Sequence, residues 1–176
     1  IARRLLAEGA SFVMTDLEPE DSILSQVLGP GKPGELDRRF GDISDSGFVE
    51  NLFSDVSPRR VIHLAGLQVP TCRENPALGA RVNVLGTLNV FEAERRQPDG
   101  VPSIVYASSA AVAGPQEDYA GGIPDGANHA PRTHYGVFKL CNEGNARIYW
   151  EDSGIPSVGL RPLTVYGVGR EGAITS

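Results

Sequence analysis

The sequence of 176 residues contains few cysteines and no grouping of metal ligands. Cys72 and Cys141 are its only cysteines, and neither has the neighbouring Cys or His residues that a zinc site requires. His129 and His134 have no carboxylate or cysteine partner at metal-binding spacing, so we expect both histidines at the surface. We therefore predict no metal site, and two free thiols in a protein of a reducing compartment.

Long hydrophobic runs and clusters of positive charge are also missing. No apolar run approaches the ~20 residues that span a bilayer. The 16 Lys and Arg residues are outnumbered by 22 Asp and Glu residues, which gives a net charge of −6. Nucleic acids and anionic membranes attract basic patches, so neither is an expected partner. We expect a soluble, cytoplasmic protein.

Short apolar segments with strand character alternate with segments of helical periodicity along the chain. This alternation predicts an α/β fold, a Rossmann-like doubly wound parallel sheet with helices on both faces in three layers. Ligands of such sheets bind beyond the carboxyl ends of the strands. We expect one domain over residues 1–176, with strands at residues 11–15, 61–65, 103–107 and 157–161 and helices at residues 78–95 and 135–151.

The sequence opens within a helical pattern, because Ile1, Leu5 and Leu6 share one helical face before Gly9. We expect an upstream piece that would carry the glycine-rich phosphate loop of a dinucleotide-binding fold. Residues 29–34 are rich in Gly and Pro but do not supply that loop. Proline lacks the amide that binds phosphate, and the stretch neither follows a strand nor opens a helix.

Asp16 closes the first expected strand. Dinucleotide-binding folds use a carboxylate at this position to accept hydrogen bonds from the adenosine ribose hydroxyls. The same charge would repel a 2′-phosphate, so Asp16 favours NAD over NADP. A loop-capping aspartate is the alternative interpretation.

Tyr135 and Lys139 are four residues apart on an expected helix, which places them on one face about 6 Å apart along the axis. An ammonium group at that distance stabilises a phenolate and lowers the pKa of tyrosine from its usual ~10, so that the tyrosine can act as a base. Ser109 follows the expected strand that ends at Ala107, and a serine there can hydrogen-bond the substrate oxygen whose proton moves. Ordinary surface packing is the alternative for such a pair.

Seven short segments occur in an order typical of one protein family. They are Asp16 and residues 41–43, 63–67, 83–87, 108–112, 135–139 and 161–167. With them the sequence resembles the extended branch of the short-chain dehydrogenase/reductase superfamily. This branch contains the NAD-dependent nucleotide-sugar epimerases and dehydratases, proteins like UDP-glucose 4-epimerase among them.

The resemblance implies NAD as the cofactor. Asp42 would accept a hydrogen bond from the exocyclic amine of adenine, while Ile43 packs on the ring. Small residues would pass beneath the cofactor, where they allow close approach of the backbone. The implied cofactor-binding residues are Asp16, Asp42, Ile43, Leu64, Ala65, Gly66, Asn83, Ala107, Tyr135, Lys139, Pro162 and Val165.

The resemblance also implies a nucleotide-linked or other sugar as substrate. The implied catalytic residues are Ser109, Tyr135 and Lys139, and the implied substrate-binding residues are Gln68, Ser109, Ala110 and Thr164. Ala113 stands where the family usually has a tyrosine, and Thr164 where it often has an asparagine, so we expect unusual sugar contacts. Ala110 and Ala111 occupy the positions of the Asp-Glu pair of the dehydratases, so elimination of water is disfavoured.

The expected activity is NAD-dependent epimerisation through a transient ketone, with Tyr135 as the base. The alternatives are a dehydrogenase or reductase that releases its product, and a non-catalytic nucleotide-binding fragment, since the family's phosphate loop and substrate-capping region are both absent from the sequence. The resemblance implies a homodimer formed through the helices around Asn83 and Tyr135. We expect His63 to be a packed core histidine and Cys141 to pack its helix.

Overall fold

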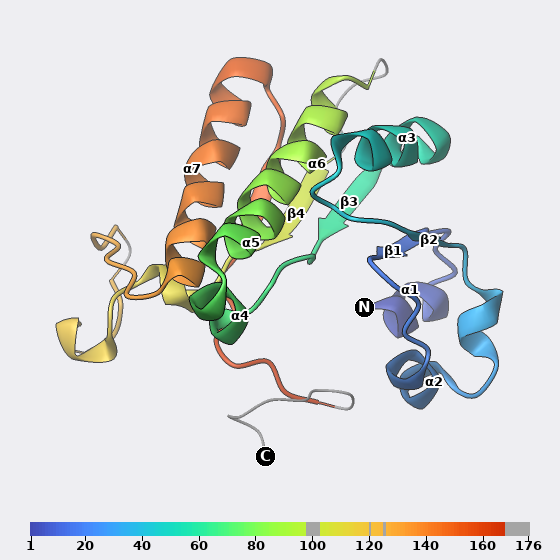
Figure 1. Ribbon diagram of the computed structural model, residues 1–176, viewed down its shortest axis with the longest axis horizontal. Coiled ribbons are helices and arrows are strands. Elements are labelled where there is room, and N and C mark those ends of the chain that lie inside the picture. Colours follow the sequence, from blue (N-terminus) through green and yellow to red (C-terminus); the bar gives the residue numbers. More distant parts are fainter. Residues whose placement is uncertain (98–102, 120, 125, 168–176) are drawn as a thin grey trace. The chain divides into compact units, whose positions relative to one another are not determined.

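The computed structural model describes residues 1–97, 103–119, 121–124 and 126–167, and we treat its two compact units separately (Figure 1). The first unit consists of Ile1–Asp42 and the stretch that begins at Thr164. The second unit is Ile43–Leu163.

The first unit contains a two-stranded parallel sheet with short helices around it. Strand β1 pairs with β2 so that Asp16 lies opposite Phe40, which places the expected adenosine-binding carboxylate at the end of a parallel strand. The sequence patterns did not predict β2 or the second helix. The elements are α1 (Ala2–Ala7), β1 (Met14–Asp16), α2 (Ser22–Leu28), the 3-10 turn η1 (Lys32–Glu35) and β2 (Arg38–Phe40).

The second unit is built on a three-stranded parallel sheet with β4 in the middle. Its strands are β3 (Arg60–His63), β4 (Ser103–Ala107) and β5 (Ser157–Leu160). His63 pairs with Tyr106 and Ala107 with Leu160, so the strands end side by side. The segments that follow the three strands therefore leave the sheet at one edge, as the sequence predicts.

Two helices of the second unit, α3 (Ser46–Val56) and α7 (His134–Ser153), begin at residues whose side chains cap them. The carboxylate of Asp45 accepts hydrogen bonds from the amides of Gly47 and Phe48 and starts α3. Helix α7 starts at Thr133, whose hydroxyl accepts from the Gly136 amide, and stops at Gly154. The helical elements are α3 (Ser46–Val56), α4 (Val69–Glu74), α5 (Pro76–Ala80), the π-helical turn η2 (Arg81–Leu85), α6 (Gly86–Arg95), the 3-10 turns η3 (Ala110–Val112) and η4 (Gln116–Asp118), and α7 (His134–Ser153).

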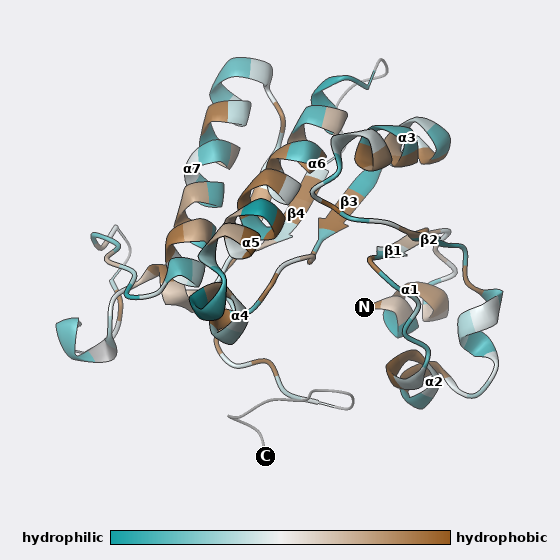
Figure 2. Ribbon diagram, viewed as in Figure 1, coloured by the Kyte–Doolittle hydropathy of each residue, from teal (hydrophilic) through white to brown (hydrophobic). Residues whose placement is uncertain are grey.

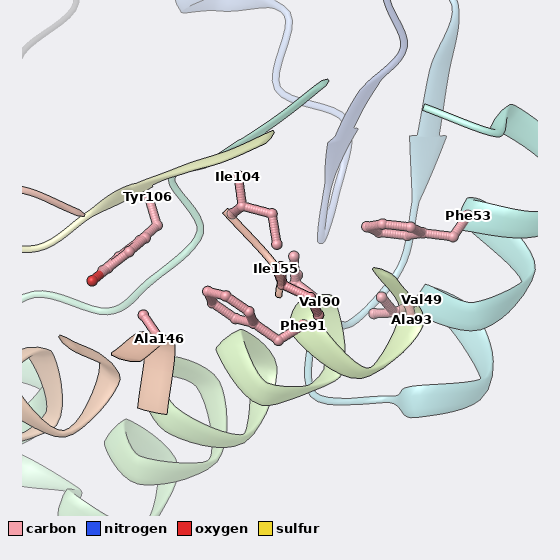
Figure 3. Close-up of a cluster of buried hydrophobic side chains, with 9 residues drawn as sticks. All are labelled: Val49, Phe53, Val90, Phe91, Ala93, Ile104, Tyr106, Ala146 and Ile155. Atoms are coloured by element: carbon pink, nitrogen blue, oxygen red, sulfur yellow. The ribbon is translucent and has the colours of Figure 1, made fainter. Parts of the chain in front are cut away.

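The hydrophobic core lies between one face of this sheet and helices α3, α6 and α7 (Figure 3). Phe91 is at its centre, stacked on Tyr149 with ring centroids 4.8 Å apart and edge-on to Tyr106 at 6.2 Å. Strand β4 is mainly hydrophobic, whereas β3 and the helices carry both hydrophobic and hydrophilic segments (Figure 2). Side chains alternate along a strand, so Ile62 and Val158 lie on the opposite face, where they are 46% and 51% exposed.

The two cysteines are free thiols, as expected, but they differ in environment. Cys72 is buried, and burial raises the pKa of its thiol. Cys141 is exposed on α7, so the expectation that it packs the helix is wrong: it lies on the helix face away from the core.

Within the described residues no group of three or more potential metal ligands occurs. The helices in the same part of the chain are all too short or too polar to cross a membrane.

Glu94 is a carboxylate buried in α6, only 1% exposed, and neither of its oxygens has a hydrogen-bond partner among the described residues. Burial raises the pKa of Glu94 to about 7. Below the unfolded pKa near 4.5 both states are protonated, so stability is unaffected there. As the pH rises to about 7, only the unfolded chain gives up the proton readily, and the folded state loses stability.

We therefore expect Glu94→Gln to raise the free energy of unfolding at pH 8 by on the order of 1–3 kcal/mol and to leave it almost unchanged at pH 4. Urea unfolding at a series of pH values measures this difference. Glu151→Gln, in an exposed i,i+4 ion pair with Arg147, is the control and should keep the wild-type pH dependence. Parallel pH profiles for Glu94→Gln and wild type would contradict the assignment.

Candidate active site

Tyr135 and Lys139 lie together at the carboxyl edge of the second unit's sheet. Thr133 caps the helix directly before them, so Tyr135 stands in its first turn and Lys139 one turn further. The Lys139 Nζ atom is 5.6 Å from the centroid of the Tyr135 ring. The same ammonium donates a 2.7 Å hydrogen bond to the carbonyl of Ala107, the last residue of β4. The structure thus brings the tyrosine, the lysine and the strand end into one place.

Lys139 is only 4% exposed, and burial lowers the pKa of its ammonium group. His63 ends β3, and the charge of Lys139 acts on its imidazole. Burial, and to a lesser degree the charge of Lys139, lowers the pKa of His63 to about 4, so this histidine is neutral at neutral pH. Its Nε2 atom is 2.9 Å from the Thr87 hydroxyl, as expected for a packed, hydrogen-bonded core histidine. Lys139 is therefore the one cation of this pair.

Two serines follow β4, and they have different surroundings. Ser108 is buried, and its hydroxyl donates a 2.5 Å hydrogen bond to Glu143. Ser109 is only partly buried; its hydroxyl caps η3 by accepting from the Ala111 amide at 3.1 Å, which leaves the hydroxyl proton available to another acceptor. The two serines therefore differ in the use of their protons, and the role of Ser109 toward a substrate stays a prediction.

Asn83 is fully buried, and its side chain holds the loop after β3. Its Oδ1 atom accepts from the Leu67 amide at 2.7 Å, and its Nδ2 atom donates to the Leu67 carbonyl at 3.0 Å. A Cβ atom on Gly66 would lie 2.7 Å from Asn83 Oδ1 and 3.4 Å from Lys139 Nζ. Only glycine allows the backbone of this loop to approach both side chains so closely.

The predicted helix at residues 78–95 is interrupted by the π-helical turn η2, which carries Asn83. The Asn83 carbonyl accepts from the Thr87 hydroxyl and from Asn142 Nδ2, each at 2.8 Å. The Asn142 side chain of α7 thereby supplies a hydrogen bond to a carbonyl at a place where the regular hydrogen bonds of the α-helix are interrupted. Hydrophobic periodicity carries no signal for such a turn, although π turns often mark functional sites.

The residues expected to contact the adenosine are divided between the two units. Asp16 is exposed, and one of its oxygens accepts from the Leu17 amide at 2.7 Å. Asp42 ends the first unit. Ile43 begins the second unit, where its carbonyl accepts from Asn89 on α6 and its side chain occupies the space that a Cβ on Gly86 would need.

A shallow hollow in the first unit adjoins Asp16. The guanidinium of Arg38 stands over the Phe40 ring, 5.2 Å from its centroid, and forms a 2.7 Å ion pair with Asp21. Its charge is therefore already matched by a carboxylate. The residues that line the hollow are Met14, Thr15, Asp16, Glu18, Glu20, Leu24, Arg38 and Phe40.

The remaining predicted site residues lie in the loop after β3, beside the end of β5 and in the first unit. Gln68 precedes α4 at its N-terminus. Pro162 follows β5, and its carbonyl accepts from the Ala110 amide at 3.1 Å, which links these two predicted site residues. Thr164 and Val165 are exposed and belong to the first unit, and Leu64 and Ala65 are exposed in the loop after β3.

A further group of polar residues beside Ser109 was not predicted to take part in the site. Glu143 accepts from Ser108 and from Arg161, and Arg161 Nη2 also lies 2.8 Å from His129 Nε2. His129 is partly exposed, with one side against Arg161, whereas His134 is exposed, as expected. The spacing of Glu143, four residues after Lys139, was the available signal.

Comparison with known proteins places this geometry in a family. The model of the "NAD dependent epimerase/dehydratase family" matches residues 1–176. A putative UDP-glucose 4-epimerase of Methanocaldococcus jannaschii is 35% identical over 177 residues, which cover 93% of this chain and 56% of that protein. The UDP-glucose 4-epimerase of Brucella ovis, solved in complex with NAD, is 27% identical with a TM-score of 0.74, over 91% of this chain and 46% of that one. A putative epimerase from Burkholderia cenocepacia is 27% identical with a TM-score of 0.79, over 97% of this chain and 51% of that one.

The fold is thus the Rossmann-like parallel α/β fold that the sequence predicts, and its class is that of the extended short-chain dehydrogenases/reductases. The chain belongs to the NAD dependent epimerase/dehydratase family, a family of enzymes. It spans about half the length of the curated relatives it matches.

Proposed function

We propose that the protein is an NAD-dependent epimerase that acts on a nucleotide-linked sugar through a transient ketone, with Tyr135 as the base. The observation that carries the proposal is the Tyr135–Lys139 pair, with Nζ 5.6 Å from the ring centroid, at the strand end that leads to Ser109. Membership of the family and the names of the relatives, several of them nucleotide-sugar epimerases, support it.

The side chains fit NAD in chemical terms. Asp16 offers carboxylate oxygen to the adenosine ribose hydroxyls. Asp42 would accept a hydrogen bond from the amine at the edge of adenine, and Ile43 would pack on the face of its ring. Gly66 gives the loop after β3 a surface without side chain, and the buried ammonium of Lys139 is a donor for the hydroxyls of the second ribose. We assign NAD to these residues together with Leu64, Ala65, Asn83, Ala107, Tyr135, Pro162 and Val165.

In the proposed reaction Tyr135 removes the proton of a sugar hydroxyl. NAD, when bound, supplies the hydride acceptor for the hydrogen on the same carbon. Lys139 stabilises the phenolate by its charge, and Ser109 donates a hydrogen bond to the sugar oxygen as it becomes a carbonyl. The reduced cofactor would supply the same hydride to the other face of the ketone, and Tyr135 returns the proton to the oxygen. The protein is unchanged and the stereocentre is inverted.

The substrate contacts proposed are Gln68, Ser109, Ala110 and Thr164. Ala110 and Ala111 have methyl groups where an acid and a base would be needed to remove water, so we propose epimerisation rather than dehydration. The Ser109 hydroxyl accepts from the Ala111 amide, and in this proposal its own proton is donated to the sugar oxygen.

The experiment that tests the function follows the conversion of UDP-glucose to UDP-galactose by the complete protein with NAD. An epimerase forms the product without accumulating NADH, whereas a dehydrogenase that releases its product accumulates NADH in step with turnover.

Calorimetric titration with NAD and NADP tests the binding of the cofactor separately. Stronger binding of NAD is expected, because Asp16 would repel a 2′-phosphate and Arg38 is already paired with Asp21. Absence of NAD binding would leave the non-catalytic alternative.

We also propose a homodimer through the helices around Asn83 and Tyr135. Val137, Cys141 and Ile148 are exposed on one face of α7, and Leu85 is exposed on the neighbouring helical segment. Exposed apolar side chains of this kind are suited to an interface between two copies.

Val137→Asp combined with Ile148→Asp is expected to convert the dimer to a monomer, because two charges would be desolvated in the interface. Light scattering coupled to size-exclusion chromatography measures the mass. The control is Leu163→Asp, an exposed apolar residue of the same unit outside these helices, which should leave the mass unchanged. A wild-type protein of monomeric mass would refute the dimer.

A further inference from the structure

Glu143 joins three segments that carry predicted site residues. Its Oε1 atom accepts from the Ser108 hydroxyl at 2.5 Å and from Arg161 Nε at 2.8 Å. Its Oε2 atom accepts from Arg161 Nη2 at 2.6 Å. The carboxylate therefore ties helix α7 to the turn after β4 and to the residue after β5. Neither Ser108 nor Arg161 can move without breaking a hydrogen bond to a charged group.

The position of Glu143 on α7 makes this connection relevant to the site. Tyr135, Lys139 and Glu143 follow one another at intervals of four residues, so they lie along one face of the helix. Lys139 bonds to the carbonyl of Ala107, and Glu143 bonds to the next residue, Ser108. Two consecutive turns of the helix thus hold two consecutive residues of the strand end, directly before Ser109.

Glu143 is connected indirectly, through Arg161 and Pro162, to the residue that follows Ser109. Arg161, which Glu143 binds through two nitrogens, precedes Pro162. The Pro162 carbonyl accepts from the Ala110 amide at 3.1 Å. The chain is therefore attached immediately before Ser109 through Ser108, which Glu143 binds directly. It is attached immediately after Ser109 through Ala110, which bonds to the residue that follows Arg161.

We infer that Glu143 is a positioning residue for the proposed epimerase reaction: it fixes the turn that carries Ser109 and the segment that carries Pro162 against the helix that carries Tyr135 and Lys139. The inference rests on the proposed function. Glu143 does not itself contact the reacting atoms, because its two oxygens are occupied by Ser108 and Arg161.

The charge state of the cluster is consistent with a fixed, ionised anchor. Burial alone would raise the pKa of Glu143, but the hydrogen bonds from Arg161 and Ser108 and the positive charge of Arg161 hold it below its usual range. Hydrogen bonds to an ionised carboxylate are shorter and stronger than those between neutral groups. Gln at this position keeps the shape and an acceptor for Ser108 but loses the charge that holds Arg161.

The test compares Glu143→Gln, Ser108→Ala and the double variant of the complete protein, with Glu151→Gln as the control. Glu151 lies on the same helix two turns further and forms an exposed ion pair with Arg147. We expect Glu143→Gln to lower kcat for UDP-glucose about 10- to 100-fold, since a displacement of about 1 Å at a reacting group has effects of this size. KM and the affinity for NAD should stay within about 3-fold of wild type, because no substrate or cofactor contact is removed. The fold-decrease of kcat in the double variant should be smaller than the product of the fold-decreases in the two single variants, because both changes release the same turn.

Hydrogen exchange reports the positioning without any substrate. The amides of residues 110 and 111 are bonded to Pro162 and Ser109, so their exchange should become faster in Glu143→Gln and stay unchanged in Glu151→Gln. Wild-type kcat in Glu143→Gln, or a kcat loss matched by an equal loss of folded protein, would overturn the inference. If the wild-type protein does not convert UDP-glucose, the proposed function fails for this substrate. The exchange result then still decides whether Glu143 fixes the turn, and unchanged exchange at residues 110 and 111 overturns it.

Discussion

Tyr135→Phe is expected to reduce the conversion of UDP-glucose about 10²- to 10⁴-fold, the usual contribution of a positioned acid–base group. The substitution removes one oxygen atom and keeps the ring that lies 5.6 Å from the Lys139 ammonium. The packing and the charge of the site are therefore preserved, and only the group that carries the proton is lost. Steady-state kinetics with the complete protein measures the effect.

NAD binding separates this chemical loss from a structural one. The affinity of Tyr135→Phe for NAD should stay within a few fold of wild type, because most of the residues assigned to the cofactor are unchanged. Tyr119→Phe is the matched control: its hydroxyl bonds to Gly114 and Asn128 in the loop after η3, and its removal should affect turnover far less. Wild-type turnover by Tyr135→Phe would refute Tyr135 as the base.

Gly136→Ala is expected to be the most damaging small substitution in the second unit. A Cβ atom at this position would lie 2.3 Å from the Ala111 carbonyl oxygen and 2.9 Å from the Pro131 side chain. Since the first of these is a backbone atom, the start of α7 would have to move away from η3. Strain of this kind costs about 1–3 kcal/mol, and sometimes more. It would also separate Tyr135 from Ser109, so turnover should fall together with stability.

Gly144→Ala provides the comparison on the same helix. No atom lies within 4 Å of the Cβ that this substitution would add, and alanine is favoured over glycine in a helix by up to about 1 kcal/mol. Urea unfolding should therefore show Gly136→Ala destabilised and Gly144→Ala unchanged or stabilised. Equal stability of the two variants would mean that α7 does not press on η3.

The elements that the sequence predicts best are those with a strong apolar pattern. The strand expected at residues 103–107 is β4, and the helix expected at residues 135–151 is α7, with one additional residue at its start and two at its end. Strand β2 was not predicted, because two of its three residues are arginines and its pairing with β1 supplies its stability. Helix α3 was also missed, although Asp45 gives a capping signal at its start.

In the candidate site, too, local sequence patterns predict some residues and not others. Helical spacing alone brings Tyr135 and Lys139 together, and the end of the strand gives the position of Ser109. The environment of His129 depends on Arg161, which is 32 residues away in the sequence, and no local pattern connects them. The buried contacts between η2 and α7 likewise require the tertiary fold. Periodicity therefore predicts that Tyr135 and Lys139 lie together, but it does not predict the contacts of the residues around them.

The register of α7 limits how this protein can vary. Tyr135, Lys139 and Glu143 act on three different partners from one helix face, and each residue of an α-helix is rotated by about 100° from the one before. Insertion or deletion of one residue between Tyr135 and Glu143 would turn the later side chains out of the site without changing any of them. In this stretch of the chain the number of residues is as restrictive as their identity.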